Sequence, residues 1–174
     1  MGLNVYTTIN EKHQQAANSA LQEALLAYDR RHGYRGSLQT VELNEQDTEQ
    51  QFLAHLAEIN NIGPLHPGLV LTTTNKVAQV YIKNQGITDV SFDNIAWARK
   101  QLSVNSMGKK PITVKQVLAP GNINHFYQNK TGEWQLAQLP QAQGALIAVD
   151  PEDGAVTALN GGFEFYNSKF NRVT

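Results

Sequence analysis

The sequence predicts a mixed β and α fold, in which a small β-barrel is inserted into a discontinuous α+β segment. Three observations predict it. Residues 10–33 have the apolar spacing of one long helix, residues 69–138 contain several short strands, and residues 145–161 form a separate hairpin pattern. Because the last strands have no reason to join the barrel, they are expected to share a domain with the N-terminal strand and helix.

The N-terminal part predicts a strand followed by a helix. "LNVYTTI", residues 3–9, alternates β-branched and polar residues, as a strand does. Asn10 is a suitable N-cap, and Gly33 can supply the left-handed conformation that ends a helix. The apolar positions that share one helical face are Ala16, Ala17, Ala20, Leu21, Ala24, Leu25 and Tyr28.

The residue composition changes near Gly36, where we place a domain boundary. A shorter helix is predicted around residues 52–57, and the two prolines and two glycines of "NNIGPLHPG" oppose regular structure after it. Strands are then predicted within residues 69–92, with turns at 75–76 and 84–86. "NIAWAR", "NINHFYQ" and "EWQLAQL" add short strands, the last two joined by the turn "NKTG". This number and spacing of strands fits a barrel of the oligonucleotide/oligosaccharide-binding (OB) type.

Alternation within "KVAQVYIK" assigns the two faces of one barrel strand. Ala78, Val80 and Ile82 share the face expected to form the core. Gln79, Tyr81 and Lys83 share the other face, which is expected to meet water. These three residues are therefore the candidate contacts for a binding partner.

The C-terminal part predicts a β-hairpin. "ALIAV" and "AVTAL" are apolar runs on either side of Asp150-Pro151-Glu152-Asp153-Gly154, a typical turn sequence. The predicted organisation is residues 1–36 as a strand and helix, residues 37–138 as the OB-like domain, and residues 139–174 as the hairpin segment.

Composition restricts the possible partners and cofactors. The chain has 174 residues, 14 Lys plus Arg against 15 Asp plus Glu, and no cysteine. A net charge of −1 disfavours a nucleic-acid-binding OB domain, and the lack of cysteine removes disulfides and thiolate metal sites. No apolar run reaches the ~18 to 20 residues needed to cross a bilayer. We expect no cofactor.

Three short motifs are typical of serine acyltransferases that react with penicillins, but their context opposes catalysis. Lys130-Thr131-Gly132 has the composition of a hairpin turn. Ser106-Met107-Gly108-Lys109 matches S-x-x-K, yet Gly108 and Pro111 oppose the helix that would hold Ser106 and Lys109 together. Ser103-Val104-Asn105 directly precedes it and so cannot line an opposite wall of one cleft. We therefore assign no catalytic residue, leaving acylation at Ser106 as an alternative that labelled penicillin would test.

The histidines and aromatic residues do not define a site by themselves. His13, His32, His55, His66 and His125 have no ligand spacing, so no metal site is assigned. Trp97, Phe126, Tyr127 and Trp134 lie in expected barrel strands. Barrel aromatics can stack on sugars or bases, although packing in the core is the more common role.

The two ends of the chain carry a family resemblance. "ALIAVDPEDGAVTALNGGFEFYNSKFNR", Ala145 to Arg172, closely resembles the start of the transpeptidase domain of class A penicillin-binding proteins. "LNVYTTIN" and "AYDRRHGYRG" resemble the segment that precedes this domain, and "RHGYRG" is typical of the penicillin-binding protein 1A group of Gram-negative bacteria. In that group an OB-like outer-membrane docking domain is inserted between these two segments. The family's catalytic motifs would follow beyond residue 174, so none is carried over to this chain.

The resemblance implies a function for the chain and for its parent protein. The parent would be a periplasmic peptidoglycan synthase anchored in the inner membrane, with glycosyltransferase and transpeptidase activities. The chain would be an excised noncatalytic fragment of it, and its OB-like domain would dock an outer-membrane lipoprotein activator. The main alternative is a module that binds glycan or peptidoglycan through barrel aromatics, which predicts sugar-induced fluorescence changes at Trp97 or Trp134.

Overall fold

The computed structural model describes residue 4 and residues 6–164, which divide into two compact units. One unit, here the sheet unit, contains Asp29–Leu139. The other, here the helix–hairpin unit, combines the described residues before 29 with those after 139. In the described residues, no helix is long and apolar enough to cross a membrane.

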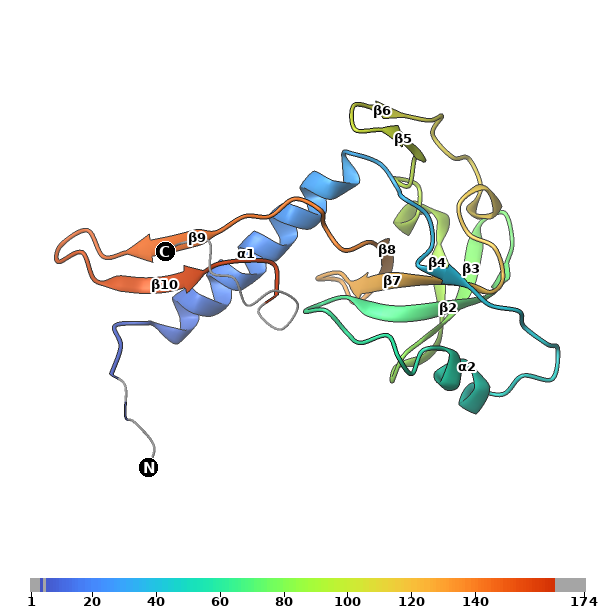
Figure 1. Cartoon of the computed structure of the whole chain (residues 1–174), viewed down its shortest axis with the longest axis horizontal. Coiled ribbons are helices and arrows are strands. Elements are labelled where there is room, and N and C mark those ends of the chain that lie inside the picture. The colour runs from blue at the N-terminus through green and yellow to red at the C-terminus, as the bar shows by residue number, and fades with distance from the viewer. Residues whose placement is uncertain (1–3, 5, 165–174) are drawn as a thin grey trace. The chain divides into compact units, whose positions relative to one another are not determined.

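The helix–hairpin unit contains helix α1 (Glu11–Arg30), whose last two residues belong to the sheet unit, and a two-stranded sheet. The predicted helix is confirmed, and the Asn10 side-chain oxygen accepts the backbone N–H of His13 at 3.2 Å as an N-cap. Strands β9 (Leu146–Val149) and β10 (Val156–Asn160) pair antiparallel around the predicted turn (Figure 1). The N-terminal part of "GGFEFYNSKFNR" is described to Glu164, and the remainder lies outside the described residues.

The predicted N-terminal strand is wrong for the described residues of "LNVYTTI". Residues 4 and 6–9 have no strand pairing, and the Tyr6 side chain is 94% exposed. The segment is attached to β10 by the Thr8 hydroxyl, which donates to the carbonyl oxygen of Val156 at 2.7 Å. This bond is made by a side chain, whereas a paired strand would bond through its backbone. The alternation of residue types in this segment therefore does not produce a strand.

The sheet unit is built on an antiparallel sheet with the ladder order β1–β7–β2–β3–β4, with β8 pairing the same edge of β7 as β1. Its strands are β1 (Gln39–Thr40), β2 (His66–Thr73), β3 (Val77–Ile82), β4 (Gly86–Ser91), β7 (Asn122–Gln128) and β8 (Trp134–Ala137). Strands β4 and β8 approach each other without a hydrogen-bonded ladder, so the OB-like barrel is nearly closed. The mixed fold class is confirmed.

Two segments differ from their predicted structure. "NIAWAR" is not a strand: a 3₁₀ turn (Phe92–Asn94) runs into it, and the inward side chains Ile95 and Ala98 are three residues apart. "QLSVNSM", for which no strand was predicted, forms the small hairpin of β5 (Gln101–Ser103) and β6 (Ser106–Met107). A second 3₁₀ turn spans Val114–Gln116.

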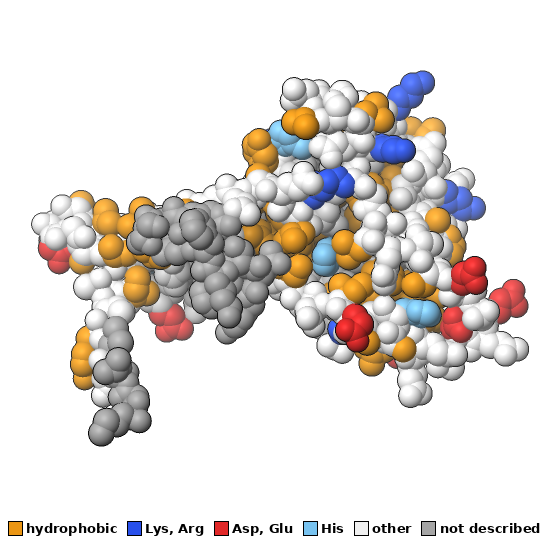
Figure 2. Space-filling model, in the orientation of Figure 1, with side chains coloured by type: hydrophobic (Ala, Val, Ile, Leu, Met, Phe, Trp, Pro, Cys, Tyr) orange, Lys and Arg blue, Asp and Glu red, His pale blue; other side chains and the backbone are white. Residues whose placement is uncertain are grey.

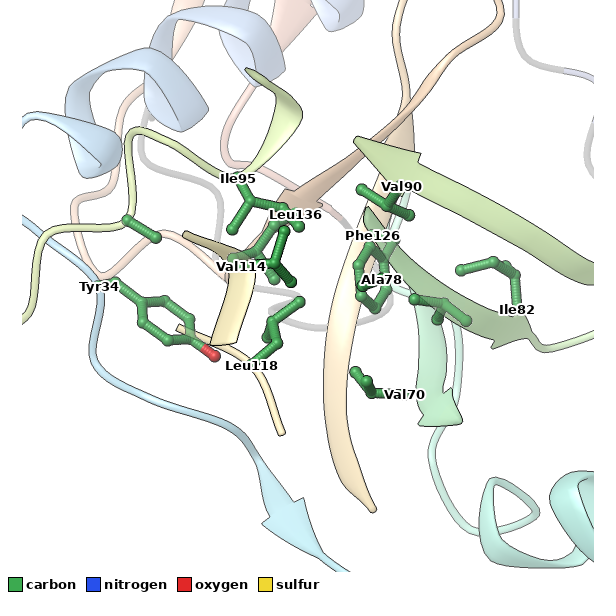
Figure 3. Packing of buried hydrophobic residues seen from close by; sticks show 12 residues of the cluster. Tyr34, Val70, Ala78, Ile82, Val90, Ile95, Val114, Leu118, Phe126 and Leu136 are labelled. Atoms are coloured by element: carbon green, nitrogen blue, oxygen red, sulfur yellow. The ribbon is translucent and has the colours of Figure 1, made fainter. Parts of the chain in front are cut away.

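The main core lies on the inner face of the curved sheet. Figure 3 shows the labelled side chains converging from strands and turns, with Phe126 of β7 among them. Phe126, Val80 and Ile82 are fully buried, as the alternation of β3 predicts. The buried residues of this core cluster are Tyr34, Val70, Ala78, Val80, Ile82, Val90, Ile95, Ala98, Val114, Leu118, Phe126 and Leu136.

The outer face of the sheet carries a second apolar cluster, which the sequence analysis did not predict. Helix α2 (Glu49–His55) and the residues after it cover this face and place Leu56 against Leu69, Tyr81 and Ile123. The strand β2 that runs beneath begins at His66, inside "NNIGPLHPG", where regular structure was not expected. Pro67 lies opposite His125 of β7, and its carbonyl oxygen accepts the backbone N–H of Lys83, one residue past the end of β3.

Candidate docking surface

The three predicted partner contacts do not share a solvent-facing surface. Gln79 is exposed, but Tyr81 is only 6% exposed and packs against Phe52, with ring centroids 5.7 Å apart. Lys83 is half-buried, and its Nζ donates to the carbonyl oxygens of Leu56, Ala57 and Ile59 at 2.8, 3.0 and 2.8 Å. The expectation that this face meets water is therefore wrong at Tyr81, because α2 forms a second layer over it.

The acyltransferase-like motifs lie in two hairpins. Lys130-Thr131-Gly132 is the β7–β8 turn, with Gly132 at a φ of 86°. Ser106 belongs to β6, and its hydroxyl oxygen lies 2.7 Å from that of Ser103. No helix holds Ser106 and Lys109 one turn apart. In this part of the chain the geometry of a serine–lysine nucleophile is not assembled.

Histidine placement is structural. His125 is 4% exposed, and burial lowers the pKa of its imidazole to about 4, so the ring is neutral near pH 7. Burial also lowers the pKa of His66, whose ring packs edge-on against Trp134 with centroids 5.3 Å apart. The described residues contain no group of three His, Asp or Glu side chains that could hold a metal ion.

The aromatic residues proposed for sugar stacking are engaged in packing. The guanidinium of Arg30 lies over the rings of Trp97 and Tyr127, 5.4 and 5.1 Å from their centroids. The indole N–H of Trp97 donates to the carbonyl oxygen of Leu136 at 3.1 Å. Phe126 is fully buried. Each of these aromatic side chains thus has a structural role in the sheet unit.

A hydrogen-bonded network, here the connector clamp, joins the segments through which the chain enters and leaves the sheet unit. The Arg35 guanidinium donates to Asp29 Oδ1 at 2.8 Å and to the carbonyl oxygen of Leu139 at 2.7 Å. The Gln138 amide donates to Asp29 Oδ2 and to the carbonyl oxygen of Gly33, both at 2.7 Å. Asp29 and Gln138 are buried, so these charge-assisted bonds are shielded from water.

A cavity of about 600 Å³, here the basic pocket, opens beside the incoming segment. Three segments form it, at residues 34–36, 98–101 and 109–117. The Tyr34 N–H donates to the Arg99 carbonyl at 2.7 Å, the Gln101 N–H to the Tyr34 carbonyl at 2.9 Å, and the Gly108 N–H to the Lys100 carbonyl at 2.8 Å. The lining is Tyr34, Arg35, Gly36, Ala98, Lys100, Gln101, Lys109, Lys110, Pro111, Ile112, Gln116 and Val117.

The charges of the basic pocket are all positive. Arg35 is paired with Asp29, but within the described part of the chain Lys100, Lys109 and Lys110 have no ion-pair partner. Sequence reasoning missed this pocket. Its signal is present in the sequence, because no Asp or Glu occurs between Asp93 and Glu133.

Comparison with known proteins identifies the sheet unit. The sequence model of the family described as "Penicillin-binding protein OB-like domain" matches residues 34–142, more than half of the chain. The chain belongs to this family. Its OB-like domain is therefore the sheet unit, together with the first residues that follow it.

The relatives extend the similarity to nearly the whole chain. Penicillin-binding protein 1A of Vibrio cholerae is 38% identical over 99% of this chain, and that of Escherichia coli is 36% identical over 99%. A crystal structure of penicillin-binding protein 1A from Haemophilus influenzae matches 98% of the chain and 23% of its own length, with a TM-score of 0.76 and 29% identity. The OB-like domain and its flanking segments are thus of the penicillin-binding protein 1A group. The chain spans about a fifth of the curated relatives, 22% and 20% of these two.

Proposed function

We propose that this chain is the noncatalytic docking portion of a periplasmic, inner-membrane-anchored peptidoglycan synthase, and that its OB-like domain binds an outer-membrane lipoprotein activator. The observation that carries the proposal is an OB-like domain whose two ends are joined by the connector clamp. A domain tied at one place leaves its remaining surface free for a partner. Peptidoglycan synthesis itself is proposed for the parent protein alone.

Activation would require the lipoprotein to favour one arrangement of the OB-like domain over another, because a ligand with equal affinity for both states shifts neither. The connector clamp could transmit such a change of arrangement to the rest of the protein, because both connecting segments meet in it. We expect that replacing residues 33–37 and 139–144 with flexible linkers in the full-length enzyme reduces activation. Unchanged activation would exclude this mechanical route while leaving docking possible.

Docking is tested by titrating the isotope-labelled chain with the soluble part of the lipoprotein and following backbone amide shifts. We expect saturable shifts confined to residues 29–139, with amides of α1 and of β9 and β10 as internal controls. A folded chain that shows no saturable shift would contradict docking.

The noncatalytic part of the proposal has its own test. Because Ser106 and Lys109 are not held together on a helix, fluorescent penicillin is expected to leave the denatured chain unlabelled. Labelling that disappears in Ser106→Ala, but not in Ser103→Ala, would show that the chain acylates by itself.

A further inference from the structure

Charge is separated along the sequence of the sheet unit. Between Asp93 and Glu133 there are six basic side chains and no carboxylate: Arg99, Lys100, Lys109, Lys110, Lys115 and Lys130. Between Arg35 and Lys76 the reverse holds, with no Lys or Arg and the carboxylates Glu42, Glu45, Asp47, Glu49 and Glu58. A chain with a net charge of only −1 thus carries two oppositely charged segments.

The two segments pair with each other through β2 and β7, but their charged side chains gather in different parts of the sheet unit. On the face that Figure 2 shows, the visible Lys and Arg side chains of the sheet unit lie mainly in the upper part, and the visible Asp and Glu side chains lie in the lower part. In Figure 1 the upper part carries β5 and β6, and the lower part carries α2. The basic pocket lies in the positive part, where its three unpaired lysines create a positive potential.

The surroundings of the basic pocket are apolar as well as positive. Ile112 lines it and is 76% exposed. Leu102 and Val104 follow the lining residue Gln101 on the β5–β6 hairpin, and they are 64% and 78% exposed. An exposed aliphatic side chain such as Ile112, beside uncompensated cations, is typical of a surface that recognises a partner with both acidic and apolar groups.

We propose that the basic pocket binds an acidic segment of a protein partner, in which carboxylate side chains lie next to aliphatic ones. Carboxylates would meet the ammonium groups of Lys100, Lys109 and Lys110, and aliphatic groups would cover Ile112. This inference rests on the proposed docking function for its choice of a protein as the partner. It adds the place of binding and the chemistry that the partner must present.

Two features favour a protein segment over a peptidoglycan strand. Sugar rings bind on exposed aromatic faces, whereas the pocket's aromatic side chain, Tyr34, is 6% exposed and packs edge-on against Trp97. The carboxylates of a peptidoglycan stem could reach the lysines. Its small methyl groups would leave Ile112 largely uncovered.

A ligand in the basic pocket would also contact a residue of the connector clamp. Arg35 lines the pocket and also bonds to Asp29 and to the Leu139 carbonyl. Tyr34 and Gly36, on either side of it, line the pocket too. A bound segment would therefore contact the chain at the point where it enters the OB-like domain.

The test is an amide-shift titration of the whole labelled chain with a capped synthetic peptide of glutamate and leucine. The control peptide has glutamine in place of glutamate. We expect saturable shifts at Tyr34, Gly36, Gln101 and Ile112 with the acidic peptide alone, and severalfold weaker binding when salt rises from about 0.05 M to about 0.3 M. Equal binding of both peptides, or shifts mapping elsewhere, would overturn the proposal.

Charge-reversal variants test the pocket directly. Lys100→Glu with Lys109→Glu is expected to weaken peptide binding by about tenfold or more. The milder pair Lys100→Gln with Lys109→Gln is expected to weaken it less. The matched control, Lys12→Glu with Lys76→Glu, makes the same charge change at exposed lysines outside the pocket and is expected to change binding by less than about twofold. Equal loss in the pocket and control pairs would show a general charge effect and contradict the site.

Two further titrations separate this inference from the proposed function. If the lipoprotein binds the wild-type chain and the Lys100→Glu with Lys109→Glu variant equally well, docking stands and this site is wrong. If the lipoprotein does not bind but the acidic peptide does, the proposed docking of the lipoprotein is wrong, and the proposal that the basic pocket binds acidic segments is retained. Muropeptides that saturate the pocket, where the acidic peptide does not, would reassign it to peptidoglycan.

Discussion

At the scale of single residues, Lys83 shows how a predicted contact can be a structural one. Its ammonium group bonds to three backbone carbonyls that follow helix α2. The Leu56 carbonyl also accepts the backbone N–H of Ile59, and a cation near a helix C-terminus is favoured by the helix dipole. Lys83 therefore fastens the outer layer to the sheet.

We expect Lys83→Met to lower the free energy of unfolding by about 1 to 3 kcal/mol, because three carbonyl oxygens lose a charged donor. Gln79→Met, on the exposed face of the same strand, is the matched control and is expected to stay within about 0.5 kcal/mol. Urea denaturation measures both variants. Equal stability of the two would mean that water replaces Lys83 without cost.

A second prediction at this scale concerns the buried His125, whose ring nitrogens have no hydrogen-bond partner among the described residues. Its pKa is lowered to about 4, so the unfolded chain binds a proton more readily than the folded chain below about pH 6.5. Stability is therefore full above pH 6.5 and falls as the pH drops toward 4, by about 3 kcal/mol in total.

Thermal denaturation between pH 7.5 and 4.5 checks this dependence, with His125→Gln as the variant that removes the titrating group. The variant is expected to lose most of the difference in unfolding free energy between the two ends of this range. The exposed His13→Gln serves as the matched control. A slope that survives in His125→Gln would assign the pH dependence to other groups.

At the scale of elements, alternation and turn residues predicted β2, β3, β4, β7, β8 and the C-terminal hairpin, because these strands depend on local pairing. They did not predict the outer layer: nothing local in "KVAQVYIK" indicates that α2, far away in sequence, covers Tyr81. The "NIAWAR" segment failed for a related reason. Its two inward residues are three apart, a spacing that belongs to a turn, and the strand reading ignored it.

The β7–β8 turn offers a prediction at this scale. The Asn129 side-chain oxygen accepts the backbone N–H groups of Thr131 and Glu133, both at 2.9 Å. Asn129→Ala is expected to destabilise the chain by about 1 kcal/mol, since two turn N–H groups lose their acceptor. Denaturation followed by fluorescence of the nearby Trp134 measures the change, with Lys130→Ala in the same turn for comparison.

At the scale of the whole molecule, the described parts of the two units differ in their cores. The sheet unit has two apolar clusters, while among the described residues of the helix–hairpin unit the buried apolar side chains are few: Ala17, Leu21, Leu25, Leu26 and Ala158. The discontinuous organisation could be predicted, because the two ends of the chain resemble neighbouring parts of one domain. The basic pocket could not be located, because it depends on the pairing of residues 34 and 100.

Unequal cores predict unfolding in two steps. Both tryptophans, Trp97 and Trp134, lie in the sheet unit, whereas α1 supplies most of the helix. The helical circular dichroism signal is therefore expected to be lost at a lower urea concentration than the tryptophan fluorescence signal. Coincident transitions would instead indicate a single cooperative unit.

The direct bond between Gln138 and Asp29 has a practical consequence for protein engineering. Because it brings the two ends of the sheet unit together, residues 29–139 form a cassette whose removal leaves only a short gap to bridge. The same property suits the cassette to transplantation, since a host protein needs only one exposed loop to receive it. Such a graft would carry the basic pocket with it, because every residue that lines the pocket lies within the cassette.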